Sequence, residues 1–189
     1  MVRSFASSVV GFDDFPFPRS YRGDVQIIGT IYTGLRLDGI ISGCIRKDGA
    51  NATDKLTRLV QDSKFASQIK LVMLQGIAMG GFNVVDIHHL HQRLKLPVLV
   101  VSRRAPNFRA IKEALLSRVP GGARKWRLIE QAGEMETTAG VYVQRAGLTL
   151  GEAGKVIERF TACGRIPEPL RVAHLIAGGV GDGQSRGRA

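Results

Sequence analysis

The sequence predicts an α/β fold in which helices flank a central sheet. Short apolar runs of strand length alternate with segments of helical periodicity, which is the pattern of layered α/β domains. At 189 residues the chain has the length of one domain and can bury a hydrophobic core without needing disulfides or structural metal ions. We expect a single domain over residues 1–177 and a Gly-rich flexible tail over residues 178–189.

Six apolar, β-rich segments are expected to be strands. A Pro-rich stretch at 15–18 breaks the chain after the first strand, and the turn signal Thr33-Gly34 separates the second from the third. Gly39 and Gly43 lie inside the third segment and indicate a bulge or a sheet edge. The predicted strands are 8–12, 25–32, 35–45, 69–74, 97–101 and 140–144.

Six further segments are expected to be helices. The first follows two candidate caps, Asn51 and Thr53, and turns Leu56, Leu59 and Val60 inward. The second joins the fourth and fifth strands into a βαβ unit, which requires a right-handed crossover. In chain order the predicted helices are a segment ending at Asp62, then 84–94, 111–118, 126–132, 150–163 and 169–177.

The chain carries a large positive charge. Its 27 Lys and Arg residues exceed its 16 Asp and Glu residues, which leaves a formal net charge of +11. Such a surplus favours anionic partners, because basic side chains attract phosphate and release its counterions. We expect nucleic acid as the partner, although a basic host proteome or simple solubility would give the same surplus. Nothing in the sequence indicates an oligomeric state.

Cysteine use and hydropathy indicate the compartment. Cys44 and Cys163 lack metal-ligand spacing, and two buried free thiols in a reducing cytosol are favoured over one disulfide. No run approaches the ~18 apolar residues needed to cross a bilayer. The first fifteen residues also lack the apolar core of a signal peptide. We expect a soluble, cytoplasmic protein without membrane contact.

Polar side chains at strand ends are the candidate catalytic residues. Asp13 ends the first strand, at the rim where open α/β sheets bind ligands, and carboxylate oxygens suit Mg²⁺. Asp48 follows the third strand and supplies a second carboxylate if the strands are neighbours. Either aspartate also fits an ordinary turn role. Gln75 ends the fourth strand, and its neutral amide argues against a complete two-metal site.

Basic and histidine residues provide further candidates. Arg103 and Arg104 follow the fifth strand at the same rim, where they can pair with a phosphate or simply lie in a solvated loop. His88 and His91, beside Asp86 on one predicted helix, have the spacing of metal ligands but no evident third ligand. The loop 76–81 precedes a helix, as phosphate loops do, but lacks their Lys and Ser/Thr.

The segment 164–174 has an unusual Pro-Glu-Pro motif. Its two prolines fix an extended entry, and Pro169 is suited to the first turn of a helix. Glu168 and Arg171 are spaced to pair with each other, and His174 follows one turn later. The physical pattern is that of a docking element.

Five motifs carry a resemblance that runs in order over nearly the whole chain. They are GFDDFPF (11–17), KDGANAT (47–53), LQGIAMGGFNVVDIHHL (74–90), LPVLVVSRRAP (96–106) and GRIPEPLRVAHLIA (164–177). Together they resemble a mainly archaeal family that is homologous to endonuclease V. The resemblance implies a ribonuclease H-like fold with a mixed central sheet, and metal-dependent phosphodiester hydrolysis near deaminated bases, with Mg²⁺ as the possible cofactor.

The resemblance assigns the site residues unevenly. Asp13 matches a metal-binding aspartate of the nuclease, and Arg103 matches a lysine that contacts phosphate. Either Asp48 or Asn51 matches the acidic residue that precedes the second helix of the nuclease. Gln75 stands where the nuclease has a second aspartate, and Ala146 falls where it has a metal-proximal histidine. Asp14, or Asp48 from the neighbouring strand, is the candidate replacement ligand.

Three functions remain open from the sequence. The leading interpretation is a nucleic-acid-binding, possible Mg²⁺-dependent endonuclease that uses Asp13 and Asp48 for metal and Arg103 with Arg104 for phosphate. The second is a non-catalytic nucleic-acid-binding module, because Gln75 and Ala146 weaken the metal site. The third is a protein–protein adaptor that uses the Pro-Glu-Pro segment and the tail.

Overall fold

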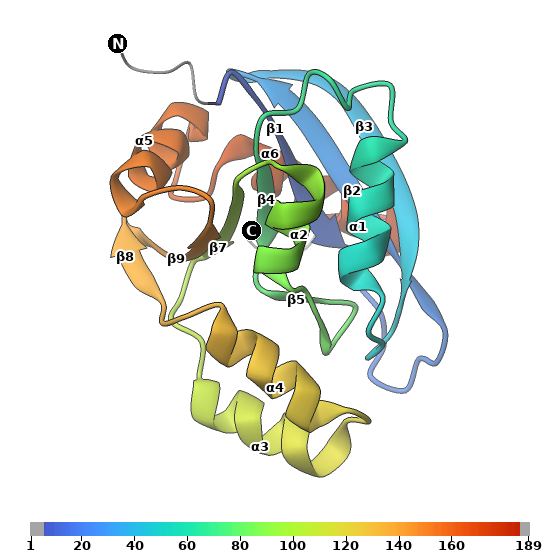
Figure 1. The fold of residues 1–189 in the computed structure, drawn as a ribbon. Coiled ribbons are helices and arrows are strands. Elements are labelled where there is room, and N and C mark those ends of the chain that lie inside the picture. The colour runs from blue at the N-terminus through green and yellow to red at the C-terminus, as the bar shows by residue number, and fades with distance from the viewer. Residues whose placement is uncertain (1–5, 186–189) are drawn as a thin grey trace.

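The computed structural model describes residues 6–185 and contains a seven-stranded mixed sheet (Figure 1). The strand order is β3-β2-β1-β4-β7-β9-β8, in which β1, β4 and β7 are parallel and the remaining neighbours are antiparallel. The predicted α/β class is therefore confirmed. The strands are β1 (Ser8–Asp14), β2 (Asp24–Thr33), β3 (Arg36–Arg46), β4 (Val72–Gln75), β7 (Val98–Ser102), β8 (Glu136–Thr138) and β9 (Val141–Ala146).

Helices cover both faces of the sheet and form one projecting hairpin. Helices α1 and α2 lie in front of the sheet in Figure 1 and α6 lies behind it. Helices α3 and α4 pack on each other at the lower end of the molecule. The helices are α1 (Ala52–Gln61), α2 (Ile87–Leu94), α3 (Phe108–Arg118), α4 (Gly122–Gln131), α5 (Leu150–Phe160) and α6 (Glu168–Gly181).

Alternation along the strands divides the core into two layers. Phe12 and Leu74 face α1 and α2, whereas Val9 and Met73 face the layer that contains α5 and the start of α6. Successive side chains of a strand point to opposite faces, so Asp13 and Gln75 both belong to the α6 side. These two polar residues therefore end neighbouring strands on one face of the sheet.

The glycines of the third strand mark an edge, as expected. A Cβ at Gly39 would lie 2.2 Å from the Phe65 ring, and one at Gly43 would lie 3.0 Å from Leu59. Both glycines thus admit side chains that pack closely over β3, which is the outermost strand on its side of the sheet.

Asn51 occupies the N-cap position of the first helix, as predicted, but neither its side chain nor that of Thr53 makes the capping hydrogen bond. Asn51 Oδ1 instead accepts hydrogen bonds from Arg46 N and Asn83 Nδ2, and Thr53 Oγ1 accepts from Asp86 N. The first-turn donor Ala52 N is satisfied by Oδ1 of the fully buried Asn83, at 3.0 Å. The cap comes from a residue 31 positions away, which local sequence patterns do not reveal.

Several other boundaries differ from the prediction. Residues 84–85 are not helical, because α2 starts only after Asp86, whose carboxylate accepts from His89 N. The short strands β5 (Ala78–Met79) and β6 (Asn83–Val84) pair as a small hairpin within the predicted 76–81 loop and beyond it. The sequence pattern does not predict strand β8, which has only three residues.

The C-terminal helix is longer than predicted. Helix α6 continues to Gly181, four residues past Ala177, and ends before Gly183, whose φ of +78° is left-handed. Residues 186–189 of the predicted tail lie outside the described residues. Cys44 and Cys163 are free thiols as predicted, but both are exposed rather than buried. Within residues 6–185, no helix is long and apolar enough to cross a membrane.

Candidate functional site

The side chain of Asp13 lies at the carboxyl end of β1 and is held from two sides. Its Oδ2 atom is 2.8 Å from Nδ1 of His174 on α6, and its Oδ1 atom accepts a hydrogen bond from Asp14 N at 3.0 Å. Asp13 is only 6% exposed. A carboxylate in this position is desolvated and depends on such donors.

The close approach of α6 to the sheet brings His174 to Asp13. A Cβ at Gly11 would lie 2.6 Å from the carbonyl carbon of Pro169, so only glycine allows this contact. Thr30 Oγ1 donates to the Pro169 carbonyl oxygen at 2.6 Å and fixes the start of the helix to β2. His174 follows just over one helical turn later, beside the end of β1.

Gln75 presents an unpartnered oxygen beside Asp13. The parallel register pairs Phe12 with Leu74, so Asp13 and Gln75 come next on their two strands. The Oε1 atom of Gln75 is buried and has no hydrogen-bond partner among the described residues. Buried polar atoms are nearly always satisfied, and an orphan is typically explained by a water, an ion or a ligand.

Asp14 points to the opposite side of the strand and contacts the β5–β6 turn. Its Oδ2 atom accepts a hydrogen bond from Gly80 N at 2.7 Å. Burial and the adjacent charge of Asp13 raise the pKa of Asp14 to about 6, against the lowering effect of the Gly80 hydrogen bond. Asp14 is therefore largely ionised at pH 7 and takes up a proton as the pH falls through about 6.

Asp48 is held by the same turn. Its backbone is left-handed, with φ of +51°, and its N–H donates to the Gly80 carbonyl at 2.8 Å. Its Oδ1 atom accepts from Phe82 N at 2.8 Å, and its carbonyl accepts from the buried Lys125 ammonium. These contacts give Asp48 a structural role in fixing the turn.

Among residues 6–185, no hydrogen bond or ion pair joins Asp13 to Asp48, which the sequence predicted to share a cation. Their carboxylates are bound to different partners, His174 in one case and the β5–β6 turn in the other. In this part of the chain, no three His, Cys, Asp or Glu side chains are placed to hold a metal ion together. The sequence signal was correct in placing both aspartates at strand ends but did not reveal which turn Asp48 would bind.

The donors at the rim fit one divalent cation at most. They are the Asp13 carboxylate, the Gln75 amide oxygen and the His174 imidazole. Hard oxygen ligands suit Mg²⁺, and the orphaned Gln75 oxygen is the atom that a cation would satisfy. Two cations need more anionic ligands than the single Asp13 carboxylate supplies, because Asp14 faces the opposite side of the strand and accepts from Gly80 N.

A basic hollow of about 520 Å³ adjoins this rim. Its lining includes Gln75, Ile166, Arg103 and Arg104. Both arginines are exposed, as predicted for residues that follow the fifth strand. Guanidinium groups at such a hollow can bind a phosphate through two parallel hydrogen bonds.

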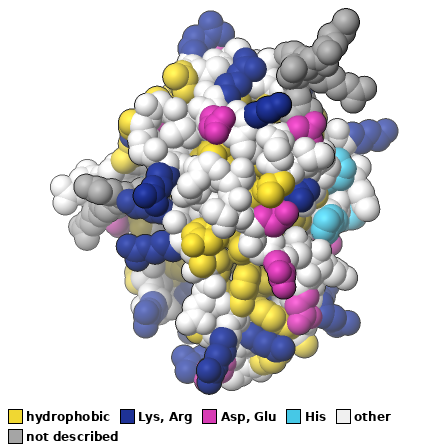
Figure 2. Space-filling model, turned by 90° about the vertical axis from the view of Figure 1, so that its left-hand side faces the viewer, with side chains coloured by type: hydrophobic (Ala, Val, Ile, Leu, Met, Phe, Trp, Pro, Cys, Tyr) yellow, Lys and Arg dark blue, Asp and Glu magenta, His cyan; other side chains and the backbone are white. Residues whose placement is uncertain are grey.

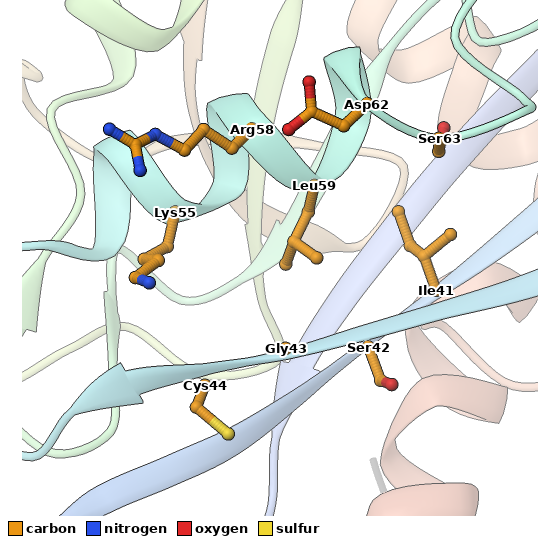
Figure 3. A pocket seen from close by; sticks show the side chains of 9 residues that line it. All are labelled: Ile41, Ser42, Gly43, Cys44, Lys55, Arg58, Leu59, Asp62 and Ser63. Carbon is orange, nitrogen blue, oxygen red and sulfur yellow. The ribbon is translucent and has the colours of Figure 1, made fainter.

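A second hollow lies away from this rim. It has a volume of about 390 Å³ and separates α1 from β3, with Leu59 pointing from the helix toward the strand (Figure 3). Lys55 and Arg58 line its helical side. Because β2 stands between β3 and β1, this hollow does not include Asp13.

The Pro-Glu-Pro segment is a structural element. Arg171 donates through Nε to Glu168 Oε1 at 2.8 Å and through Nη2 to Oε2 at 2.6 Å, and Glu168 is only 7% exposed. Residues 166–170 are all buried, so they present no docking surface for an adaptor protein. The ion pair instead holds the first turns of α6, on which His174 is mounted.

The histidine pair considered as a metal site is corrected. His88 and His91 bind backbone carbonyls of Gln131 and Leu96, so they do not form the considered metal pair. Ala146 is a buried residue of β9, and the histidine beside the rim is His174. The helical spacing of Glu168, Arg171 and His174 was the available signal for His174, but its partner lies 161 positions away.

Comparison with known proteins identifies the family of this chain. A sequence profile described as Endonuclease dU matches residues 6–181. The chain belongs to the Endonuclease dU family. A UPF0215 protein of Deinococcus radiodurans is 60% identical and the match covers 96% of this chain and 93% of the relative. A UPF0215 protein of Methanothermobacter thermautotrophicus is 41% identical, with 96% and 91% covered.

Solved structures agree with this family assignment. A crystal structure from Archaeoglobus fulgidus has a TM-score of 0.85 and 36% identity, with 92% of this chain and 97% of that chain covered. Endonuclease V of Ciona intestinalis, bound to DNA that contains inosine, has a TM-score of 0.58 at 12% identity, with 90% and 84% covered. Human ENDOV gives 0.57 at 16% identity, with 92% and 84% covered. The predicted endonuclease V-like, ribonuclease H-like fold is thereby confirmed for this Endonuclease dU family member.

Proposed function

We propose that this Endonuclease dU family protein binds DNA at the rim of β1, β4 and β7 and cleaves a phosphodiester bond beside deoxyuridine. The family description names an endonuclease and dU, and an endonuclease V of the same fold has been crystallised with DNA. One observation carries the proposal: the Asp13 carboxylate and the orphaned Gln75 oxygen end adjacent strands, next to a hollow lined by two arginines.

Each rim residue has a distinct part in this reaction. Arg103 and Arg104 bind the phosphate and offset the charge that builds up on it. Asp13 and Gln75 provide the oxygen ligands for one Mg²⁺ ion, with His174 at their side. When bound, this ion supplies charge compensation and a more acidic water. The Asp13 carboxylate favours the His174 tautomer whose proton is on Nδ1 and fixes the orientation of the ring.

A cleavage assay tests the proposal. Labelled DNA with a single deoxyuridine is incubated with Mg²⁺ or Mn²⁺, and matched DNA with thymidine or inosine and the corresponding RNA serve as comparison substrates. Cleavage should require the cation, prefer deoxyuridine and fall at least about 100-fold in Asp13→Asn. Undiminished cleavage by Asp13→Asn would refute the assignment. An equal loss in Asp48→Asn would reinstate the predicted Asp13 and Asp48 pair.

A second function is favoured by the neutral Gln75. With one firm carboxylate at the rim, the protein would serve as a binding module that recognises nucleic acid without cleaving it. It would then bind DNA with strong salt dependence and show no turnover with any cation. The same assay separates the two functions, because a binding module gives a mobility shift but no product.

A further inference from the structure

The α3–α4 hairpin, together with the two arginines that precede it, carries more than half of the net charge of the chain. Residues 103–131 contain eight Lys and Arg residues and two Glu residues, a net charge of +6 within a total of +11. A purely structural hairpin has no need for such a surplus, because clustered like charges repel one another.

Most of these basic side chains face solvent. Seven of the eight are exposed, and Figure 2 shows several Lys and Arg side chains at the lower end of the molecule, where the hairpin lies in Figure 1, in addition to others at the top and side. The buried exception is Lys125, which anchors the hairpin to the Asp48 carbonyl. The exposed basic residues are Arg103, Arg104, Arg109, Lys112, Arg118, Arg124 and Arg127.

The hairpin is held firmly beside the proposed cleavage rim. Its two helices share a small core in which Leu115 and Ile129 pack with Val84 of β6. The Asp48 carbonyl accepts a hydrogen bond from Lys125 Nζ, and the Asp48 side chain holds the β5–β6 turn that contacts Asp14. The chain enters α3 directly from Arg103 and Arg104 at the end of β7. Charges on the hairpin thus keep a fixed position relative to the rim.

We infer that the α3–α4 hairpin is an arm that binds the phosphate backbone of duplex DNA flanking the cleavage site. The inference rests on the proposed function, which places DNA at the adjacent rim. Regularly spaced phosphates are the complement of a fixed array of exposed guanidinium groups, and contacts of this kind position the duplex without reading its sequence. The arm therefore supplies affinity and register, and the rim supplies the chemistry.

Salt dependence of binding tests the arm directly. The arm variant carries Arg109→Gln, Arg118→Gln, Arg124→Gln and Arg127→Gln. The control variant carries Lys55→Gln, Arg58→Gln, Lys155→Gln and Arg159→Gln, which remove the same charge from exposed positions of α1 and α5. Affinity for a deoxyuridine-containing duplex is measured in EDTA across a range of salt concentrations, so that cleavage plays no part.

The arm variant should bind the duplex at least about tenfold more weakly than wild type at 0.1 M salt. The slope of the logarithm of its binding constant against the logarithm of salt concentration should be smaller in magnitude by about 2 to 4, because each phosphate contact contributes roughly 0.9 to that slope. The control variant should keep the wild-type slope. Equal slopes in the two variants would overturn the inference. If the protein cleaves deoxyuridine DNA but the two variants have equal slopes, the proposed function stands and the arm is refuted. If the arm variant alone has a reduced slope but the protein does not cleave, the arm stands and the proposed cleavage is refuted.

The only tryptophan of the chain gives an independent readout. Trp126 lies on α4, with Lys112 Nζ 5.1 Å from its ring centre and Phe108 against its edge. Duplex DNA bound at the arm should change the Trp126 emission in wild type and in Asp13→Asn, and this change should be lost in the arm variant at matched DNA concentration. Emission that does not respond to saturating DNA would contradict the arm.

Discussion

His174 Nδ1 lies 2.8 Å from Oδ2 of Asp13, although 161 positions separate the two residues. This contact joins the last helix to the first strand at the point where the rim chemistry is proposed. Its geometry depends on Gly11, which allows the start of α6 to approach β1, and on the Glu168–Arg171 pair within that helix. Changes at the contact should therefore affect both stability and cleavage.

Replacement of His174 by alanine should destabilise the fold by about 1–3 kcal/mol, because the buried Asp13 carboxylate loses a hydrogen-bonding partner. Cleavage should fall as well. His174→Asn retains a donor near Asp13 and should recover more stability than activity. Urea denaturation and the cleavage assay provide the two measurements. If alanine and asparagine variants matched wild type in both, the contact would be incidental.

Asp14 should make the stability of the protein depend on pH. Its pKa is raised to about 6, mainly by burial and then by the charge of Asp13, so the folded state retains a proton that the unfolded state releases near pH 4. The free energy of unfolding should thus fall as pH rises from about 4 to about 6, by at most about 3 kcal/mol for a shift of this size.

The variant Asp14→Asn tests this dependence, since asparagine still offers an oxygen to Gly80 N but does not titrate. Its free energy of unfolding, measured by urea in EDTA at pH 4.5 and pH 7, should decline less over this range than that of wild type. Parallel declines in the two proteins would show that other groups carry the pH dependence.

Substitutions of Gln75 should separate cation binding from folding. Gln75→Leu removes the orphaned oxygen and should keep or increase stability, because an unsatisfied polar atom is replaced by an apolar one. The same change should weaken Mg²⁺ binding measured by calorimetry. Gln75→Asp adds an anionic ligand beside Asp13 and should strengthen Mg²⁺ binding while destabilising the cation-free protein. Unaltered Mg²⁺ affinity in both variants would place the cation elsewhere.

The sequence predicted those parts of the site that depend on strand ends. Asp13, Gln75 and Arg103 follow apolar runs, and parallel strands bring their carboxyl ends to one rim. The contacts of His174 and Asn83 could not be predicted in this way, because each depends on packing between segments distant in the sequence. The same holds for Asp48, whose left-handed backbone and turn partner are set by the unpredicted β5–β6 hairpin.

The β5–β6 turn leads to a prediction with a matched control. Gly81 has φ of +82°, and a Cβ there would lie 2.4 Å from Oδ1 of Asp48. Gly121 has φ of +70° and nothing within 4 Å of the corresponding position. Alanine at Gly121 should cost about 1 kcal/mol, which is the strain of the left-handed backbone alone.

Alanine at Gly81 should cost more, by about 1–3 kcal/mol, because it also displaces the Asp48 carboxylate from Phe82 N. Since Asp48 connects the turn to Lys125 of the arm, Gly81→Ala should in addition weaken DNA binding, whereas Gly121→Ala should not. Urea denaturation and DNA titration of both variants check this. Equal stability losses would mean that the turn absorbs the extra methyl group, and that the Asp48 carboxylate contributes little to holding the turn and the arm together.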